Sequence, residues 1–299
     1  MLQQYSAKNK DILVYINGDL IHRDQAGISP FDSSVQNGDA VWEGLRLYQG
    51  SIFRLDAHLD RLYKSAMMLR YEGMPERHEV IEAIRKTLRA NDMNDGVHVR
   101  LTVTRGIKYT SGLDPRINDQ GCSLIVLAEH KPPVYNNDGI HIVTVQQRRP
   151  FADVLDQRIH SCNQLTSILA KLEANDAGAD DALMLDTNGY LAETNATHLF
   201  LLKDEILLTS TTKACPAGIT RATLFELCQS HHIPYEERDI SVHEIYKADE
   251  VFCTGTMGEI VPVTRIDNTV FHEGTAGPVT QRIVGLYRTL TLHEGTWIT

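Results

Sequence analysis

The sequence lacks the cysteine patterns that would indicate disulfide bonds or a structural zinc site. Its five cysteines are scattered along 299 residues and odd in number, and no two of them form a C-x-x-C pair. Such cysteines are typical of free thiols in a reducing compartment. Zinc-binding cysteines would be more tightly clustered, so we expect no metal site.

The chain also has no long hydrophobic run and no excess of positive charge. No segment approaches 18 consecutive apolar residues, and the N-terminus is polar where a signal peptide would be apolar, with the sequence MLQQYSAKNKD. The formal net charge of −10 disfavours nucleic acid or an anionic membrane as the main partner. These absences predict a cytoplasmic protein that binds neither nucleic acid nor membrane.

Several catalytic motifs are absent as well. The sequence has no G-x-x-x-x-G-K-[ST], G-x-G-x-x-G, H-E-x-x-H or G-x-S-x-G pattern. Nucleotide hydrolysis, dinucleotide redox chemistry, zinc proteolysis and α/β-hydrolase chemistry are therefore disfavoured.

The sequence does contain a mixture of strand and helix patterns in a chain of 42% hydrophobic residues, which is enough for a packed core. Strand pairs flank the turn signals Asn17-Gly18 and Gln49-Gly50. Apolar residues recur at helical spacing in three segments, which are residues 57–70, 77–90 and 163–177. In the third helix, one face carries four apolar residues: Leu165, Ile168, Leu169 and Leu172.

A breaker-rich stretch divides the chain. Residues 130–139 contain a Pro-Pro pair and an Asn-Asn pair between two strand patterns. We therefore predict an α+β protein of two domains, with residues 1–129 in a small N-terminal domain, 130–139 as a linker and 140–299 in a larger C-terminal domain.

Three segments could carry chemistry. Residues 216–221, PAGITR, form a turn leading into a helix start, where free backbone amides suit a phosphate; an ordinary N-capped helix is the alternative. Residues 252–259, FCTGTMGE, could wrap an anion or form a plain turn. Glu193 lies in an otherwise apolar strand region and needs a partner, which is either a structural cation or the cationic nitrogen of a ligand.

Taken together and in this order, the chain's motifs resemble the fold-type IV, or class IV, aminotransferases that use pyridoxal phosphate. The resemblance extends over nearly the whole chain. Its motifs are G-D-x-V-x-E-G-x-R at 38–46, H-L-D-R-L at 58–62, T-R-G at 104–106, N-x-x-x-x-x-L-A-K-x-E-A at 163–174, G-x-x-x-E at 189–193, G-I-T-R at 218–221 and E-x-x-x-x-x-T at 250–256. The resemblance implies the two-domain architecture of the D-amino-acid aminotransferase-like enzymes.

The resemblance also implies cofactor contacts. Arg61 matches the arginine that holds the cofactor phosphate, and its guanidinium fork suits that group. Glu193 matches the acid that pairs with the pyridine nitrogen, which keeps the ring an effective electron sink. The remaining phosphate contacts would come from two turns, formed by Ile219 with Thr220 and by Gly255 with Thr256.

On the substrate side, the resemblance implies contacts from Trp42, Arg100 and Met257. Trp42 matches an aromatic pocket wall, and Arg100 matches an arginine that could hold a substrate carboxylate, although a structural arginine is also compatible. The loop after T-R-G lacks the R-x-H expected of D-amino-acid enzymes. These features favour L-amino acids of the branched-chain type over D-amino acids.

The sequence departs from the family pattern at the catalytic lysine. Members carry a Schiff-base lysine in a pattern resembling I-K-S-x-N, whereas this chain reads I-H-S-C-N, with His160 at the lysine position. Lys171 lies eleven residues further along, about 12 Å or more on a helix. Lys213 is near the phosphate turn, but the pattern gives it no catalytic role. A histidine within reach could move a proton in place of the lysine.

These observations leave several hypotheses. His160 is a substitute base in a working enzyme, an idle residue in a non-catalytic binder of the cofactor, or a bystander to another lysine that forms the Schiff base; an engineered lysine variant is a further alternative. We expect a pyridoxal-phosphate-dependent aminotransferase that acts on a branched-chain amino acid and a 2-oxo acid, with His160 and Glu193 as its catalytic residues. The alternatives are a D-amino-acid transaminase or a lyase. The family also implies a homodimer.

Overall fold

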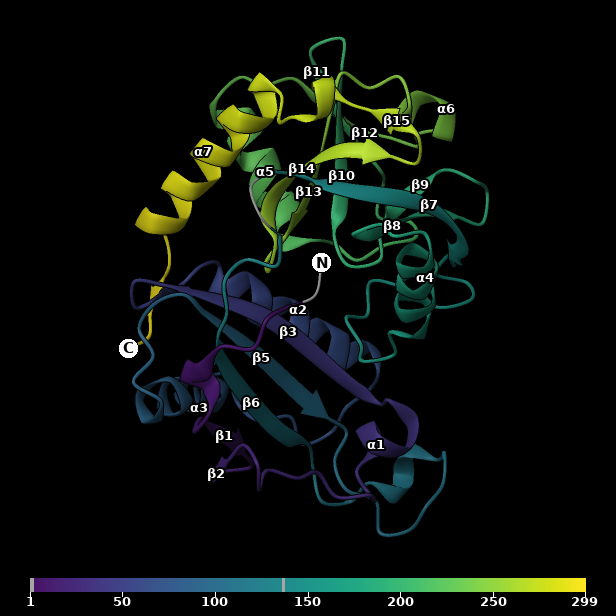
Figure 1. The fold of residues 1–299 in the computed structure, drawn as a ribbon. Coiled ribbons are helices and arrows are strands. Elements are labelled where there is room, and N and C mark those ends of the chain that lie inside the picture. Colours follow the sequence, from purple (N-terminus) through teal and green to yellow (C-terminus); the bar gives the residue numbers. More distant parts are fainter. Residues whose placement is uncertain (1–2, 136–137) are drawn as a thin grey trace. The chain divides into compact units, whose positions relative to one another are not determined.

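The computed structural model describes residues 3–135 and 138–299. Their contacts divide the chain into two compact units (Figure 1). The N-terminal unit contains residues 3–132 together with Ile159–Asn163 and Thr291–Thr299. The C-terminal unit contains Pro133–Arg158 and Gln164–Leu290.

This division differs from the predicted domain boundaries in two segments. Residues 159–163 join the N-terminal unit because they run beside strand β3: the Trp42 amide donates to the His160 carbonyl at 3.1 Å, and the Cys162 amide donates to the Ala40 carbonyl at 2.8 Å. The last residues join it because β16 pairs with β4 and Ile298 is buried in its core. Asn136 and Asn137, within the predicted linker, lie outside the described residues.

The N-terminal unit is built on a seven-stranded antiparallel sheet in the order β16-β4-β3-β5-β6-β1-β2. Figure 1 shows β3, β5 and β6 side by side. Its strands are β1 (Leu13–Ile16), β2 (Asp19–His22), β3 (Ala40–Tyr48), β4 (Ser51–Ile52), β5 (Val97–Thr104), β6 (Ser123–His130) and β16 (Thr296–Trp297). Its α-helices are α1 (Ser33–Asn37), α2 (Leu55–Met68) and α3 (Arg77–Ala90), and short 3-10 turns are η1 (Ala7–Asn9) and η2 (Pro115–Ile117).

Both predicted hairpins are confirmed. β1 and β2 pair antiparallel across Asn17 and Gly18, whose φ angles are 49° and 108°. β3 and β4 pair across Gln49 and Gly50 in the same way. Asn and Gly tolerate these left-handed backbone angles, which match the twist of the flanking strands.

Alternation along β5 sets the two faces of this sheet. Val97, Val99, Leu101 and Val103 are buried in one core with the apolar residues of α2 and α3. The opposite face therefore carries the intervening side chains, among them His98 and Arg100.

The C-terminal unit is built on a nine-stranded mixed sheet in the order β12-β11-β10-β13-β14-β7-β8-β9, with β15 paired to β14. Its strands are β7 (Ile140–Arg149), β8 (Asp181–Asp186), β9 (Leu191–Thr194), β10 (His198–Lys203), β11 (Ile206–Thr209), β12 (Tyr235–Glu237), β13 (Glu250–Gly255), β14 (Glu259–Ile266) and β15 (Thr269–Val270). Its α-helices are α4 (Leu165–Asp176), α5 (Ile219–Ser230), α6 (Val242–Ile245) and α7 (Pro278–His293), and a 3-10 turn is η3 (His272–Gly274). The residues of α7 from Thr291 onward belong to the N-terminal unit.

Helix α4 confirms the helix expected near 163–177, but its apolar stripe is exposed. Ser167, Ala170 and Ala174 form the buried face, and these small side chains let α4 lie against β7 and β8. The four apolar side chains of the other face remain 66%, 55%, 38% and 52% exposed, in the order Leu165, Ile168, Leu169 and Leu172. No helix in the described part of the chain is long and apolar enough to span a membrane.

Candidate functional site

A buried carboxylate organises charged side chains in the N-terminal unit. Glu43, on β3, is completely buried. His58 and Arg61 lie on one face of α2, because residues three apart in a helix are neighbours. The Arg61 guanidinium forks onto the carboxylate, with Nε 2.8 Å from Oε1 and Nη2 2.7 Å from Oε2. His58 Nδ1 lies 2.7 Å from Oε2.

His160 approaches the same carboxylate from the 159–163 segment. Its Nδ1 lies 2.5 Å from the Trp42 carbonyl oxygen and 3.5 Å from Glu43 Oε1. Its ring stacks on the Trp42 indole at a centroid distance of 4.3 Å, and its backbone amide donates to the Ser65 hydroxyl at 3.0 Å. Strand β3, helix α2 and the backbone together fix the position of this imidazole.

The charges in this cluster are balanced by burial and pairing. Burial alone would raise the pKa of Glu43, but Arg61 and His160 hold that pKa well below its usual range. Burial, followed by the charge of Arg61, lowers the pKa of His160, and Glu43 partly opposes this effect. Burial likewise lowers the pKa of His58. The cluster is therefore a carboxylate–guanidinium ion pair flanked by two histidines whose pKa values are lowered.

Arg100 is connected to this cluster by Trp42, whose ring contacts both Arg100 and His160. Its guanidinium carbon is 3.4 Å from the centroid of the Trp42 ring, which is a cation–π contact, and its Nη2 is 3.7 Å from the Cys162 sulfur. Burial, and then the cations of Lys131, Arg100 and Arg46, lower the pKa of His98 to about 3. This face of the sheet is thus positively charged and suits a carboxylate.

In the C-terminal unit, Glu193 has a cationic protein partner. Its Oε1 lies 3.0 Å from Nε of Arg149, and both side chains are buried. Arg149 also donates to the Ser167 hydroxyl at 2.9 Å and to the backbone carbonyls of Thr194 and Asn195. Of the two partners considered for Glu193, the structural cation is therefore present as Arg149. The pairing of Glu193 with a ligand nitrogen stays a prediction.

The two phosphate-binding turns predicted from the sequence both lie close to one histidine, His198. Gly218 caps α5, and a Cβ at this position would lie 2.4 Å from the His198 ring. On β10, His198 is the register partner of Thr254 on β13, and Gly255 and Thr256 follow directly. A Cβ on Gly255 would approach the Thr197 methyl at 3.1 Å. The fold therefore brings Ile219 and Thr220 close to Gly255 and Thr256.

This arrangement fits a phosphate group. The first amides of a helix have no partner within the helix and attract anions, and the start of α5 presents those of Ile219 and Thr220. The Thr254 hydroxyl is buried without a hydrogen-bond partner among the described residues. Glycine at 218 keeps the backbone close to His198. We call these residues, 218–220 with 254–256, the phosphate cradle.

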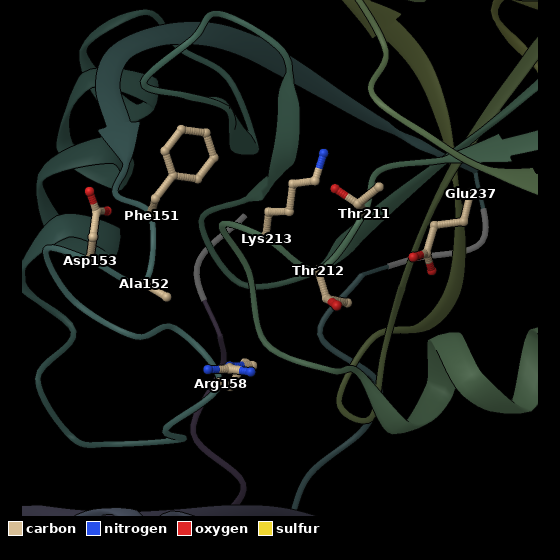
Figure 2. Close-up of a pocket in the computed structure, with 8 residues that line it drawn as sticks. All are labelled: Phe151, Ala152, Asp153, Arg158, Thr211, Thr212, Lys213 and Glu237. Atoms are coloured by element: carbon tan, nitrogen blue, oxygen red, sulfur yellow. The ribbon is translucent and has the colours of Figure 1, made fainter.

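The two alternative lysines both hold carboxylates within the C-terminal unit. Lys171 Nζ is 3.1 Å from Asp181 Oδ1, and Lys213 Nζ is 3.1 Å from Asp239 Oδ2. Lys213 also lines a pocket of about 780 Å³ (Figure 2), whose other residues are Phe151, Ala152, Asp153, Arg158, Thr211, Thr212 and Glu237. The remaining predicted substrate residue, Met257, accepts a backbone hydrogen bond from Val134 at 3.1 Å.

The chain is similar to known proteins along most of its length. The family described as "Amino-transferase class IV" matches residues 40–266. The chain belongs to the class IV aminotransferase family. "Branched-chain-amino-acid aminotransferase-like protein 2" of Arabidopsis thaliana is 50% identical over 289 residues, which cover 96% of this chain and 52% of that protein.

Other relatives match along most of their own length. The "Putative branched-chain-amino-acid aminotransferase" of Methanocaldococcus jannaschii is 38% identical over 271 residues, covering 90% of this chain and 93% of that protein. The crystal structure of the branched-chain amino acid aminotransferase from Thermobaculum terrenum, in its PLP-form, has a TM-score of 0.84 at 27% identity and covers 95% of both chains. This chain spans about half the length of the Arabidopsis relatives.

For this member of the class IV aminotransferase family, the two-domain α+β fold expected from the resemblance is confirmed. Four residues that organise the site had no predicted role, namely Glu43, His58, Arg149 and His198. Glu43 and His58 lie within the motifs at 38–46 and 58–62, and their place in these motifs was the sequence feature that could have identified them as site residues. Arg149 and His198 lie outside those motifs, and no sequence signal identified them.

Proposed function

We propose that this chain is a pyridoxal-phosphate-dependent aminotransferase that moves an amino group between a branched-chain amino acid and a 2-oxo acid. The observation that carries the proposal is the phosphate cradle, in a chain that belongs to the class IV family. Bound pyridoxal phosphate would supply an aldehyde and an electron-accepting ring. The cradle would hold its phosphate, assisted by Arg61, and Glu193 would face its ring nitrogen.

The substrate contacts follow from the N-terminal unit. Arg100 would hold a substrate carboxylate, since its guanidinium contacts the Trp42 ring and a thiol and belongs to a positively charged sheet face. Trp42 and Met257 would supply apolar contacts to a branched side chain.

His160 would move the proton that a lysine moves elsewhere in the family. The Trp42 carbonyl oxygen can only accept a hydrogen bond, so the proton of the neutral ring resides on Nδ1. Nε2 then carries a lone pair and can accept a proton from a substrate carbon. The carboxylate partners of Lys171 and Lys213 support a site that uses neither lysine.

A half-reaction tests this function. The protein loaded with pyridoxal phosphate is mixed with L-leucine, L-glutamate or D-alanine, and conversion to the pyridoxamine form is followed by absorbance. We expect conversion with the L-amino acids, and we expect the K213A variant to retain it. Faster conversion of D-alanine would support the D-amino-acid alternative. No conversion despite bound cofactor would contradict the proposal and favour a non-catalytic binder, the second candidate because the His160 side chain is only 13% exposed.

We also propose that the protein is a homodimer in which the exposed stripe of α4 contacts a second copy. The stripe consists of four large apolar side chains, those of Leu165, Ile168, Leu169 and Leu172. Large contiguous apolar patches on a protein surface mark interaction sites. The centres of homodimer interfaces are depleted of charge, and a twofold axis would let the same stripe meet itself.

A further inference from the structure

We infer that Glu43 is a positioning residue that orients His160 as a proton acceptor, with Nδ1–H held between the Trp42 carbonyl oxygen at 2.5 Å and Glu43 Oε1 at 3.5 Å and the Nε2 lone pair presented for proton transfer. The inference rests on the proposed function for its catalytic consequence. The orientation itself can be measured on the protein without cofactor.

The carboxylate of Glu43 is held in one orientation by its partners. Both Glu43 oxygens are fixed by Arg61 at 2.8 and 2.7 Å, and His58 Nδ1 adds a third contact at 2.7 Å. Because a carboxylate only accepts, His58 also carries its proton on Nδ1. The carboxylate cannot rotate without breaking these bonds, so Oε1 stays on the side of His160, 3.5 Å from its Nδ1.

The imidazole of His160 is held in one position by Trp42 and Ser65. The side chain of His160 is 13% exposed and is held by Trp42 through both the stacked ring and the carbonyl oxygen. Ser65, on α2, fixes the backbone at this residue. Both acceptors, the carbonyl and the carboxylate, lie at Nδ1, so the surroundings select one tautomer.

The charges of the cluster favour a proton on His160 during the reaction. With both histidines neutral, Glu43 and Arg61 cancel each other. When a substrate C–H bond breaks, the proton would form a bond to Nε2 and the electron pair would remain on the substrate side. The imidazolium would then lie beside an anionic oxygen already in place, so no reorganisation is required as charge develops.

The charged groups around His160 act in opposite directions. Arg61, on α2, disfavours the imidazolium, whereas Glu43, on β3, favours it. His58 belongs to the same cluster but is deeply buried and directs Nδ1 at the other carboxylate oxygen. Removal of the Glu43 charge therefore leaves His160 facing Arg61 without its counterion.

The test is NMR of the full chain, labelled with ¹⁵N in the histidine rings, without cofactor. In the wild type we expect the neutral His160 ring to carry its proton on Nδ1 and not on Nε2. In E43Q, we expect His160 to titrate at lower pH than in the wild type, and E43D should restore part of the difference. D39N is the matched control, because Asp39 pairs with Arg105 in the same unit and His160 should titrate there as in the wild type.

A proton on Nε2 in the wild type would overturn the inference, as would unchanged titration of His160 in both folded Glu43 variants. If E43Q does not fold, the wild-type tautomer and E43D still decide. With cofactor, H160Q should slow the half-reaction by about 10²–10⁴-fold, the usual contribution of a positioned base, and E43Q by a smaller factor. Failure of the proposed function would abolish conversion in the wild type but leave the NMR result intact.

Discussion

At the scale of the residue, the structure shows how one buried carboxylate determines the state of its neighbours. Arg61 was predicted from the resemblance to contact a cofactor phosphate, and that role stays a prediction. In the structure its guanidinium forks onto Glu43. A motif identifies which residue types recur at a spacing, but it does not show which of their side chains pair with one another in the fold. Glu43 was therefore part of a recognised motif, but the sequence did not predict its ion pair with Arg61.

The same cluster predicts an acid-sensitive fold. Burial lowers the pKa values of His58 and His160 below the ordinary value of 6.5. Below pH 6.5 the unfolded chain then binds more protons than the folded chain, so the free energy of unfolding should decrease as the pH falls through 6.5. Glu43, whose pKa is depressed, contributes in the same direction at still lower pH.

Urea denaturation of wild type and H160N between about pH 7.5 and 5 measures this effect. We expect the loss of stability on acidification to be smaller in H160N, because one group with a depressed pKa is removed. Equal pH dependence of the two proteins would show that His160 does not titrate below its ordinary range. The H78N variant is the matched control, because His78 is exposed at the start of α3 and has no contact with this cluster among the described residues.

At the scale of the element, local patterns predicted the type and place of the hairpins and of the three helices. The two hairpins followed from Asn-Gly and Gln-Gly turns, in which all four residues have positive φ angles. Helix α4 followed from its spacing of apolar residues, but spacing does not identify which side is buried. The small side chains of Ser167, Ala170 and Ala174 pack against the sheet, and the larger residues lie outside.

The exposed stripe predicts how α4 variants assemble. We expect I168E/L172E to reduce the sedimentation coefficient from that of a dimer toward that of a monomer, because two charges would be buried in an apolar contact. Analytical ultracentrifugation of the wild type, this variant and L292E, which changes an exposed leucine on α7, measures the effect. A wild-type monomer, or a dimer unaffected by the α4 charges, would contradict the proposed interface.

At the scale of the whole molecule, the sequence predicted two domains but not the path of the chain between them. Residues 159–163 and 291–299 belong to the N-terminal unit although they follow the predicted linker. Their pairing with β3 and β4 depends on long-range backbone hydrogen bonds, which leave no periodic signal in the sequence. The consequence for function is that His160 shares a unit with Arg61 and Trp42, whereas Glu193 shares one with the phosphate cradle.

A crystal structure of the protein with pyridoxal phosphate would show whether the phosphate cradle holds the cofactor and whether any lysine bonds to it. We expect the phosphate to accept hydrogen bonds from the amides at the start of α5 and from the turn at Gly255 and Thr256, with Glu193 at the ring nitrogen and no covalent bond to any lysine. A phosphate bound away from the cradle, or electron density joining the cofactor to Lys171, Lys213 or another lysine, would contradict the proposed lysine-free site.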